Sequence, residues 1–126
     1  MHKVYPYDAT MKIETLLGEN FLKKKSLNDK EKDNVFVTEE CHMEEVKQHC
    51  KFVGLLFSAN WCPPCKCFLD ILKEFYFDAN IDQKQLEIVY VPLDRNEEDF
   101  RDHYAAMPWV SYPFAHPKIS ELKSYY

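Results

Sequence analysis

The sequence predicts an α/β fold organised around a strand–helix–strand unit. Two apolar runs, at 51–58 and 86–93, are almost uninterrupted, which is typical of strands buried on both faces of a parallel sheet. Between them, residues 63–80 change to a helical period. Parallel neighbours need a crossover connection, usually a helix, so these three segments predict a βαβ core with further helices flanking it.

The composition limits what such a protein can be. Its 126 residues suffice for one domain, and 46% hydrophobic with 29% charged residues is typical of a folded chain. The net charge of −5 argues against nucleic acid as the main partner, because phosphate binding needs a basic face. No apolar run approaches the ~20 residues of a membrane span. The first residues carry no continuous apolar core, so we expect no secretory signal and a cytoplasmic location.

The N-terminal part of the chain is the most polar. We expect residues 1–33 to form an extension with a short helix near 11–24 and a charged loop, and residues 34–126 to form the domain. The short helix is predicted from apolar residues at helical spacing. These residues are Ile13, Leu16, Leu17 and Phe21.

A short strand and a helix are predicted next. Residues 34–38 are rich in β-branched and aromatic side chains, as strands are. Thr38 is a suitable N-cap, and carboxylates at Glu39 and Glu40 would favour the start of a helix through the helix dipole. The apolar face of that helix comprises Met43, Val46 and Cys50.

The helix at 63–80 is amphipathic, and Asn80 is its expected end. We expect its apolar face to pack on the sheet. The residues on that face are Cys65, Phe68, Leu69, Leu72, Phe75, Tyr76 and Ala79. A second helix at 96–106 begins with acidic residues and directs Phe100 and Tyr104 inward. A final short helix is indicated by Ile119 and Leu122.

A Cys-x-x-Cys motif lies where the first buried strand meets the long helix. Cys62 and Cys65 are separated by Pro63 and Pro64. A helix N-terminus presents unsatisfied N–H groups and about half a positive charge, and both favour the thiolate, which is the nucleophilic form of cysteine. A following proline biases Cys62 toward an extended backbone, so Cys62 is the predicted N-cap with Pro63 at the first helical position.

This placement assigns different roles to the two cysteines. Cys65 falls one turn inside the helix, so we expect Cys62 to attack a substrate disulfide and Cys65 to resolve the mixed disulfide by closing the Cys62–Cys65 bond. Pro64 has no N–H to offer the sulfur, so Pro64→Gly is predicted to lower the pKa of Cys62 by adding a donor. This chemistry implies no metal and no organic cofactor.

Zinc binding is the alternative for such a motif, and it needs a second Cys/His pair at ligand spacing. Cys41, His42, His49 and Cys50 are the candidates. On one helix, however, the two histidines would lie ~10 Å apart and the two cysteines ~13 Å apart along the axis, too far for one ion or one disulfide. We therefore expect no metal, and we expect Cys41, Cys50 and Cys67 to be packing residues.

These motifs resemble those of the thioredoxin superfamily. Segment 58–66, SANWCPPCK, is similar to the family's active-site segment, and its Pro-Pro pair points to the tryparedoxin and nucleoredoxin branch. Segments 91–100, VPLDRNEEDF, and 107–114, MPWVSYPF, follow in the order found in that branch. Segment 17–22, LGENFL, is similar to its N-terminal segment, and the clear resemblance covers 52–126.

The resemblance implies a thiol–disulfide oxidoreductase. Trp61 would shield the cysteines, and Pro108 and Trp109 would help to form the surface around them. Protein disulfides, including those of a peroxiredoxin, would be the substrates, and an unidentified thiol would be the reductant, in the cytoplasm or the nucleus. Leu56 stands where many thioredoxins carry a buried carboxylate, and an apolar residue there is similar to the tryparedoxin branch.

The resemblance also implies that the C-terminal side of the fold is missing. In the superfamily, a strand that begins with a cis-proline faces the motif, followed by an antiparallel partner strand and a last helix. This chain ends about where that strand would begin. The strand at 51–58 would then be an exposed edge, open to association with another copy. The alternatives are a truncated chain, a domain completed by a partner chain, and a catalytically weak interaction module.

Overall fold

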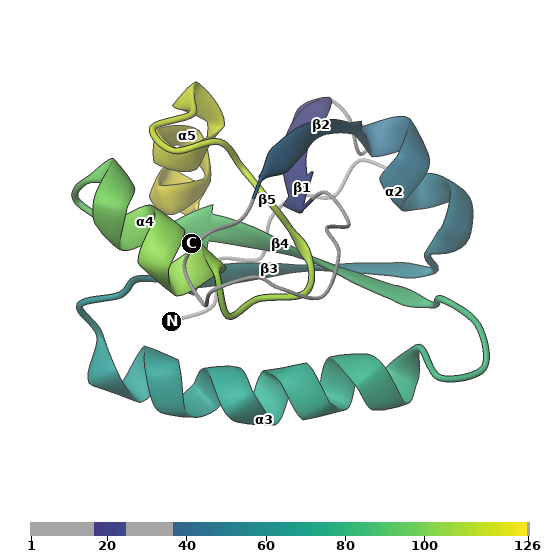
Figure 1. Cartoon of the computed structure of the whole chain (residues 1–126). Coiled ribbons are helices and arrows are strands. Elements are labelled where there is room, and N and C mark those ends of the chain that lie inside the picture. The colour runs from purple at the N-terminus through teal and green to yellow at the C-terminus, as the bar shows by residue number, and fades with distance from the viewer. Residues whose placement is uncertain (1–16, 25–36, 126) are drawn as a thin grey trace.

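The computed structural model describes residues 17–24 and 37–125, which form a five-stranded sheet with helices against it (Figure 1). The strands are β1 (Asn20–Lys24), β2 (Thr38–His42), β3 (Phe52–Ser58), β4 (Leu86–Pro92) and β5 (Val110–Ser111). The helices are α2 (Met43–His49), α3 (Pro63–Ala79), α4 (Glu97–Tyr104) and α5 (Pro117–Tyr125).

The sheet has the order β2-β1-β5-β4-β3. β4 is parallel to both β3 and β5, whereas β1 is antiparallel to β2 and β5. The predicted strand–helix–strand unit is confirmed as β3, α3 and β4, with Leu55 opposite Val89 in the register. The α/β fold class predicted from the sequence is therefore confirmed.

The side chains of β4 divide the interior into two cores, because successive side chains of a strand point to opposite faces. Val89 and Val91 pack with residues of α2 and α5, whereas Ile88 and Tyr90 pack with residues of α3 and α4. All four side chains are at most 4% exposed. β4 is thus buried on both faces, as its apolar run predicts.

β3 lies at the end of the sheet in the part of the chain that the structure describes. Leu55 and Leu56 are only half-buried, and Phe52 is 65% exposed. Burial on both faces was therefore the wrong prediction for this strand, because no described element covers its outer side. Among the strands that the structure describes, none pairs with the outer edge of β3, in agreement with the exposed edge predicted at 51–58.

α3 has nearly the predicted length, but its apolar face is only partly buried. Leu69 and Tyr76 are buried against the sheet. Phe68 and Phe75 are 50% and 59% exposed, as is Ile71 at 64%. These three residues lie on one flank of the helix, and the prediction that the whole apolar face packs on the sheet was wrong for that flank.

The structure corrects the prediction of a helix near 11–24. Residues 11–16 lie outside the described part, and Asn20–Lys24 form strand β1. Leu17 is helical, but Gly18 follows with a φ of 86°, a left-handed conformation that favours glycine and breaks the helical path. Phe21 is fully buried between its neighbouring strands. The secondary structure of Asn20–Lys24 is therefore determined by pairing within the sheet, which the local spacing of apolar residues does not reveal.

The strand and helix that follow are shifted along the chain. Thr38 does not cap a helix; it begins β2, which pairs with β1 from Thr38 to His42. α2 begins at Met43, and residues 34–36 lie outside the described part. The two-residue strand β5 was not predicted, because Pro108 and Pro113 bound it closely.

The last two helices are confirmed. In α4, Phe100 and Tyr104 are buried, and the Asn96 side chain caps the helix by accepting the backbone N–H of Asp99 at 2.8 Å. In α5, Ile119 and Leu122 are buried. α3 and α4 contribute to one core, and α2 and α5 contribute to the other. Because α3 follows β3 along the chain, the cysteine motif at the start of α3 lies at the carboxyl end of β3 (Figure 1).

Candidate active site

The Cys-x-x-Cys motif begins α3. Cys62 is the N-cap with an extended backbone (φ −105°, ψ 101°), and Pro63 and Pro64 take the first two helical positions. Cys62 and Cys65 are joined in a disulfide whose Cα atoms lie 5.2 Å apart, within the usual range for such a bond. The predicted N-cap placement of Cys62 is confirmed, and the two sulfurs are placed to open and close a disulfide.

The turn that precedes the motif is held by the loop after β4. The backbone N–H of Asn60 donates to Oδ1 of Asp94 at 2.7 Å, and the N–H of Leu93 donates to the carbonyl of Ser58 at 2.9 Å. Oδ2 of Asp94 accepts the hydroxyl of Tyr90. Burial, followed by this hydrogen bond, raises the pKa of Tyr90, so its hydroxyl remains a donor. Asp94 is therefore a buried anchor for the active-site turn.

Trp61 lies across the same loop. Its indole N–H donates to the carbonyl of Leu93 at 3.3 Å, and the guanidinium carbon of Arg95 lies 5.2 Å from its ring centroid. The side chain is 51% exposed. These two contacts hold an aromatic surface next to Cys62, where it can touch an incoming protein.

A buried histidine that the sequence did not reveal lies beneath the turn. Oγ of Ser58 and Nε2 of His103 are 2.8 Å apart, and both residues are buried. The His103 ring meets Tyr90 edge-on, with centroids 5.5 Å apart. Burial lowers the pKa of His103; the charge of Asp94 opposes this shift, and the smaller effect of Lys66 adds to it. Its position three residues after the inward-facing Phe100 was the signal that could have found it.

Pro108 and Trp109 lie away from the disulfide. Trp109 is 2% exposed and packs edge-on against Tyr76, with ring centroids 5.3 Å apart. Tyr76 is separated from Cys65 by roughly 16 Å of α3, at 1.5 Å per residue. Because Trp109 directly precedes β5, which is parallel to β4, it lies near the amino ends of these strands, whereas the motif follows the carboxyl end of β3.

The other three cysteines are free thiols. Cys41 lies in β2 rather than in a helix, and burial, followed by the charge of Glu45, raises its pKa to about 11. Cys50 is half-buried, and burial raises its pKa. Cys67 is exposed, so the prediction that it is a packing residue on the flank of the core face was wrong, because its side of α3 faces solvent. Among the described residues, no three His, Cys, Asp or Glu side chains are grouped to hold a metal ion.

Comparison with known protein families shows where this strand–helix–strand core and its cysteine pair belong. The profile of the thioredoxin-like family matches residues 49–126. This range includes the disulfide and every described element from β3 to α5. The chain belongs to the thioredoxin-like family. The fold class and the superfamily expected from the motifs are thereby confirmed.

The thioredoxin-like chain is similar to tryparedoxin from Trypanosoma brucei brucei, at 47% identity over 73 residues, 57% of this chain and 50% of that protein. It is also similar to nucleoredoxin from Danio rerio, at 41% identity over 64 residues, 51% of this chain and 15% of that protein. The solved structure of tryparedoxin I from Leishmania major has a TM-score of 0.63 and 34% identity, covering 89% of this chain and 68% of that one. The predicted tryparedoxin and nucleoredoxin branch is confirmed.

Two further facts define this thioredoxin-like chain. It spans about half the length of the tryparedoxin that it matches and a smaller share of the nucleoredoxin. Among the helices that the structure describes, none has the length and apolar character needed to span a bilayer. Its relatives are thiol–disulfide oxidoreductases of the thioredoxin superfamily, and Cys62 and Cys65 are the cysteine pair at disulfide distance.

Proposed function

We propose that the chain is a thiol–disulfide oxidoreductase that reduces protein disulfides through Cys62 and Cys65. The observation that carries this proposal is the Cys62–Cys65 disulfide at the N-terminus of α3 in a thioredoxin-like chain. At this position the helix dipole favours the Cys62 thiolate. The two sulfurs carry both electrons of the reaction, so the proposed chemistry needs no metal and no organic cofactor.

The proposed reaction is two successive exchanges. The Cys62 thiolate attacks one sulfur of the substrate disulfide, which forms a mixed disulfide and releases the other substrate sulfur as a thiolate. The Cys65 thiolate then attacks the Cys62 sulfur, which closes the Cys62–Cys65 bond and releases the second substrate sulfur. The substrate gains the two electrons that the dithiol loses. Because the half-buried Leu56 carries no carboxylate, the proton of Cys65 passes to solvent or to the released thiolate.

The proposed partners follow from the same chemistry. The substrates are protein disulfides, with a peroxiredoxin as the class suggested by resemblance to tryparedoxins, and an external thiol reduces the Cys62–Cys65 bond again. The exposed ring of Trp61 supplies an aromatic contact for such a protein. Resemblance to tryparedoxins and nucleoredoxins supports a location in the cytoplasm or the nucleus.

Reduction of insulin by dithiothreitol, followed as turbidity, tests the proposal. The chain is expected to accelerate precipitation, Cys62→Ser to abolish the acceleration, and Cys65→Ser to accumulate a mixed disulfide with insulin. Cys67→Ser is the matched control and is expected to keep full activity. No acceleration by the unmutated chain, or equal acceleration by Cys62→Ser, would contradict the enzyme proposal.

A second candidate function, an interaction module, is favoured by apolar side chains exposed on β3 and α3. Phe52 lies in β3, whose outer edge no other described strand covers, and Ile71 and Phe75 lie on one flank of α3; each of the three is 59–65% exposed. Such an edge is a template for another chain, including a second copy. Sedimentation velocity is expected to show association that Phe75→Asp weakens and that Phe77→Asp, on the opposite flank of α3, does not. Equal effects of the two variants would argue against this surface.

A further inference from the structure

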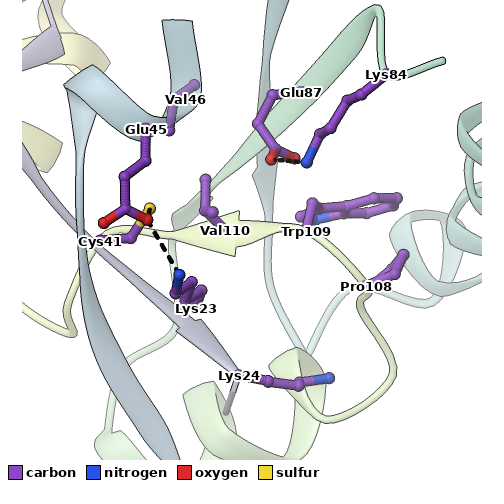
Figure 2. Close-up of a pocket in the computed structure, with 10 residues that line it drawn as sticks. All are labelled: Lys23, Lys24, Cys41, Glu45, Val46, Lys84, Glu87, Pro108, Trp109 and Val110. Atoms are coloured by element: carbon purple, nitrogen blue, oxygen red, sulfur yellow. Dashed lines mark hydrogen bonds and ion pairs between the residues drawn. The ribbon is translucent and has the colours of Figure 1, made fainter. Parts of the chain in front are cut away.

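The proposed exchange reactions make no use of one buried ionisable side chain, His103. It is 3% exposed, and its Nε2 lies 2.8 Å from Oγ of Ser58, which is 2% exposed. At the start of β4, by contrast, the buried Glu87 accepts hydrogen bonds from Tyr76 at 3.1 Å and from Lys84 at 2.6 Å, and Figure 2 shows the pair with Lys84. His103 differs, because its second ring nitrogen, Nδ1, has no partner among the described residues.

Nδ1 of His103 reaches solvent. In the part of the chain that the structure describes, the one fully buried side-chain nitrogen or oxygen without a partner is Nε1 of Trp109. Nδ1 has no partner either, so it is not fully enclosed. The ring therefore joins a hydroxyl inside the protein, through Nε2, to water outside, through Nδ1. A neutral imidazole with its proton on Nδ1 can accept the hydroxyl proton of Ser58 at Nε2.

Ser58 lies on the face of the sheet that α3 covers. Side chains alternate along a strand, so Ser58 shares a face with Leu56, which packs against the core that includes Leu69 of α3. Cys65 precedes Leu69 by about one helical turn, so it lies on the side of α3 that faces the sheet. Ser58 is also the last residue of β3, where the turn into α3 begins. Its hydroxyl therefore lies beneath the first turn of α3, on the side of Cys65.

The charges around His103 place its ring close to the same turn. Asp94, in the loop after β4, and Lys66, which follows Cys65 in α3, are the charged groups that act on it. Burial lowers the pKa of His103 from 6.5, Asp94 opposes that shift, and Lys66 adds to it. Tyr90 of β4 meets the ring edge-on and stays protonated, because burial raises its own pKa. The ring is therefore neutral at neutral pH and can accept a proton.

We propose that His103 accepts the proton of Cys65 through Ser58 when Cys65 closes the disulfide. The inference rests on the proposed function and supplies a path for the proton that Leu56 cannot take. As Sγ of Cys65 bonds to Sγ of Cys62, the thiol proton passes to Oγ of Ser58, and the hydroxyl proton passes to Nε2 of His103. The bond between Cys62 and the substrate sulfur breaks, and the substrate leaves as a thiolate. Nδ1 then releases a proton to water, which restores the neutral ring.

The aromatic disulfide DTNB tests this relay in the reduced Cys67→Ser chain, which lacks the exposed free thiol. Attack by Cys62 releases one thionitrobenzoate and closure by Cys65 releases a second, so one absorbance trace separates the two steps. The two other free thiols, whose pKa values burial raises, react more slowly.

The pH dependence of closure is the decisive measurement. The rate should reach a plateau between the pKa of His103, lowered from 6.5, and that of the Cys65 thiol, ordinarily ~8.5, because the neutral ring removes the proton over this range. A rate that rises about tenfold per pH unit throughout, as the thiolate fraction does, would overturn the proposal without any change at His103.

Variants then separate the relay from mere support of the turn. On the plateau, His103→Gln is expected to slow closure about 10-fold or more and to leave the release by Cys62 unchanged. Ser58→Ala should cause the same loss, and Ser58→Thr, which keeps the hydroxyl, should restore the rate. His116→Gln, at a half-buried histidine before α5, is the matched control with no effect.

The outcomes distinguish the relay from the proposed function. The loss in His103→Gln should vanish below the pKa of this histidine, where the ring is already protonated; a loss of equal size at every pH would overturn the relay. Two releases whose rates His103→Gln does not change would overturn the relay alone. Absence of the second release would overturn the proposed dithiol reaction, and the relay with it.

Discussion

Removal of the Asp94 side chain is the perturbation whose size the structure defines best. Asp94→Ala leaves two donors without acceptors, the backbone N–H of Asn60 and the hydroxyl of Tyr90. Tyr90 is fully buried, so its hydroxyl bears the whole desolvation cost, whereas Asn60 is half-buried and water can reach its N–H. At about 1–3 kcal/mol for each buried unpaired group, we predict a loss of about 2–4 kcal/mol in the free energy of unfolding.

Asp94→Asn removes the carboxylate but leaves a side chain of the same shape that can still form both hydrogen bonds. Its amide oxygen still accepts from Asn60, and the Tyr90 hydroxyl can accept from the new NH₂ group, so we predict a loss of only about 1 kcal/mol. Urea unfolding of the oxidised chain, followed by circular dichroism, measures both variants. Asp102→Ala, exposed on α4, is the control and should stay within about 0.5 kcal/mol. Equal losses for the two Asp94 variants would refute the reasoning, as would a loss below ~1 kcal/mol for Asp94→Ala.

Three further predictions concern protons and thiols. Burial lowers the pKa of His103 from 6.5, so below that pH the unfolded chain takes up a proton on this ring more readily than the folded chain does. The free energy of unfolding should therefore fall as the pH drops through 6.5, and it should fall less steeply in His103→Gln. Urea unfolding at several pH values measures both. Pro64→Gly should lower the pKa of Cys62, measured as the pH dependence of its alkylation in the reduced chain; a rise or no change would contradict the role given to the missing N–H. In the oxidised chain, iodoacetamide should modify the exposed Cys67 well before Cys41, whose pKa is raised to about 11. Mass spectrometry of early time points measures the order, and modification of Cys41 first would contradict the prediction.

The sequence revealed those parts of the fold that depend on local pattern. The apolar run of β4 and the helical period of α3 are periodicities within one segment, so they could be recognised without neighbours. The N-cap position of Cys62 could be predicted for the same reason, because Pro63 restricts the backbone of the residue before it. The N-terminal segments could not, because Asn20–Lys24 became a strand through pairing with β2 and β5.

Around the disulfide, too, the features that depend on contacts between distant segments could not be predicted from the sequence. Nothing in the local sequence indicates that Asp94 holds the backbone of Asn60, or that His103 reaches Ser58, because these contacts join segments more than thirty residues apart. Trp109 was expected near the motif by resemblance, yet it lies at the other end of the parallel strands. Its distance from the motif follows from the direction of β5, which a two-residue strand between prolines does not reveal.

The sequence by itself therefore determined the family, the strand–helix–strand core and the cysteine pair, because each depends on residues close together along the chain. Only the tertiary structure decided the placement of β1 in the sheet, the polar support below the active-site turn and the burial of Trp109 away from the disulfide. Those features depend on which strands pair and which side chains meet across the sheet, and both are set by the burial of apolar surface over the whole chain rather than by any one segment.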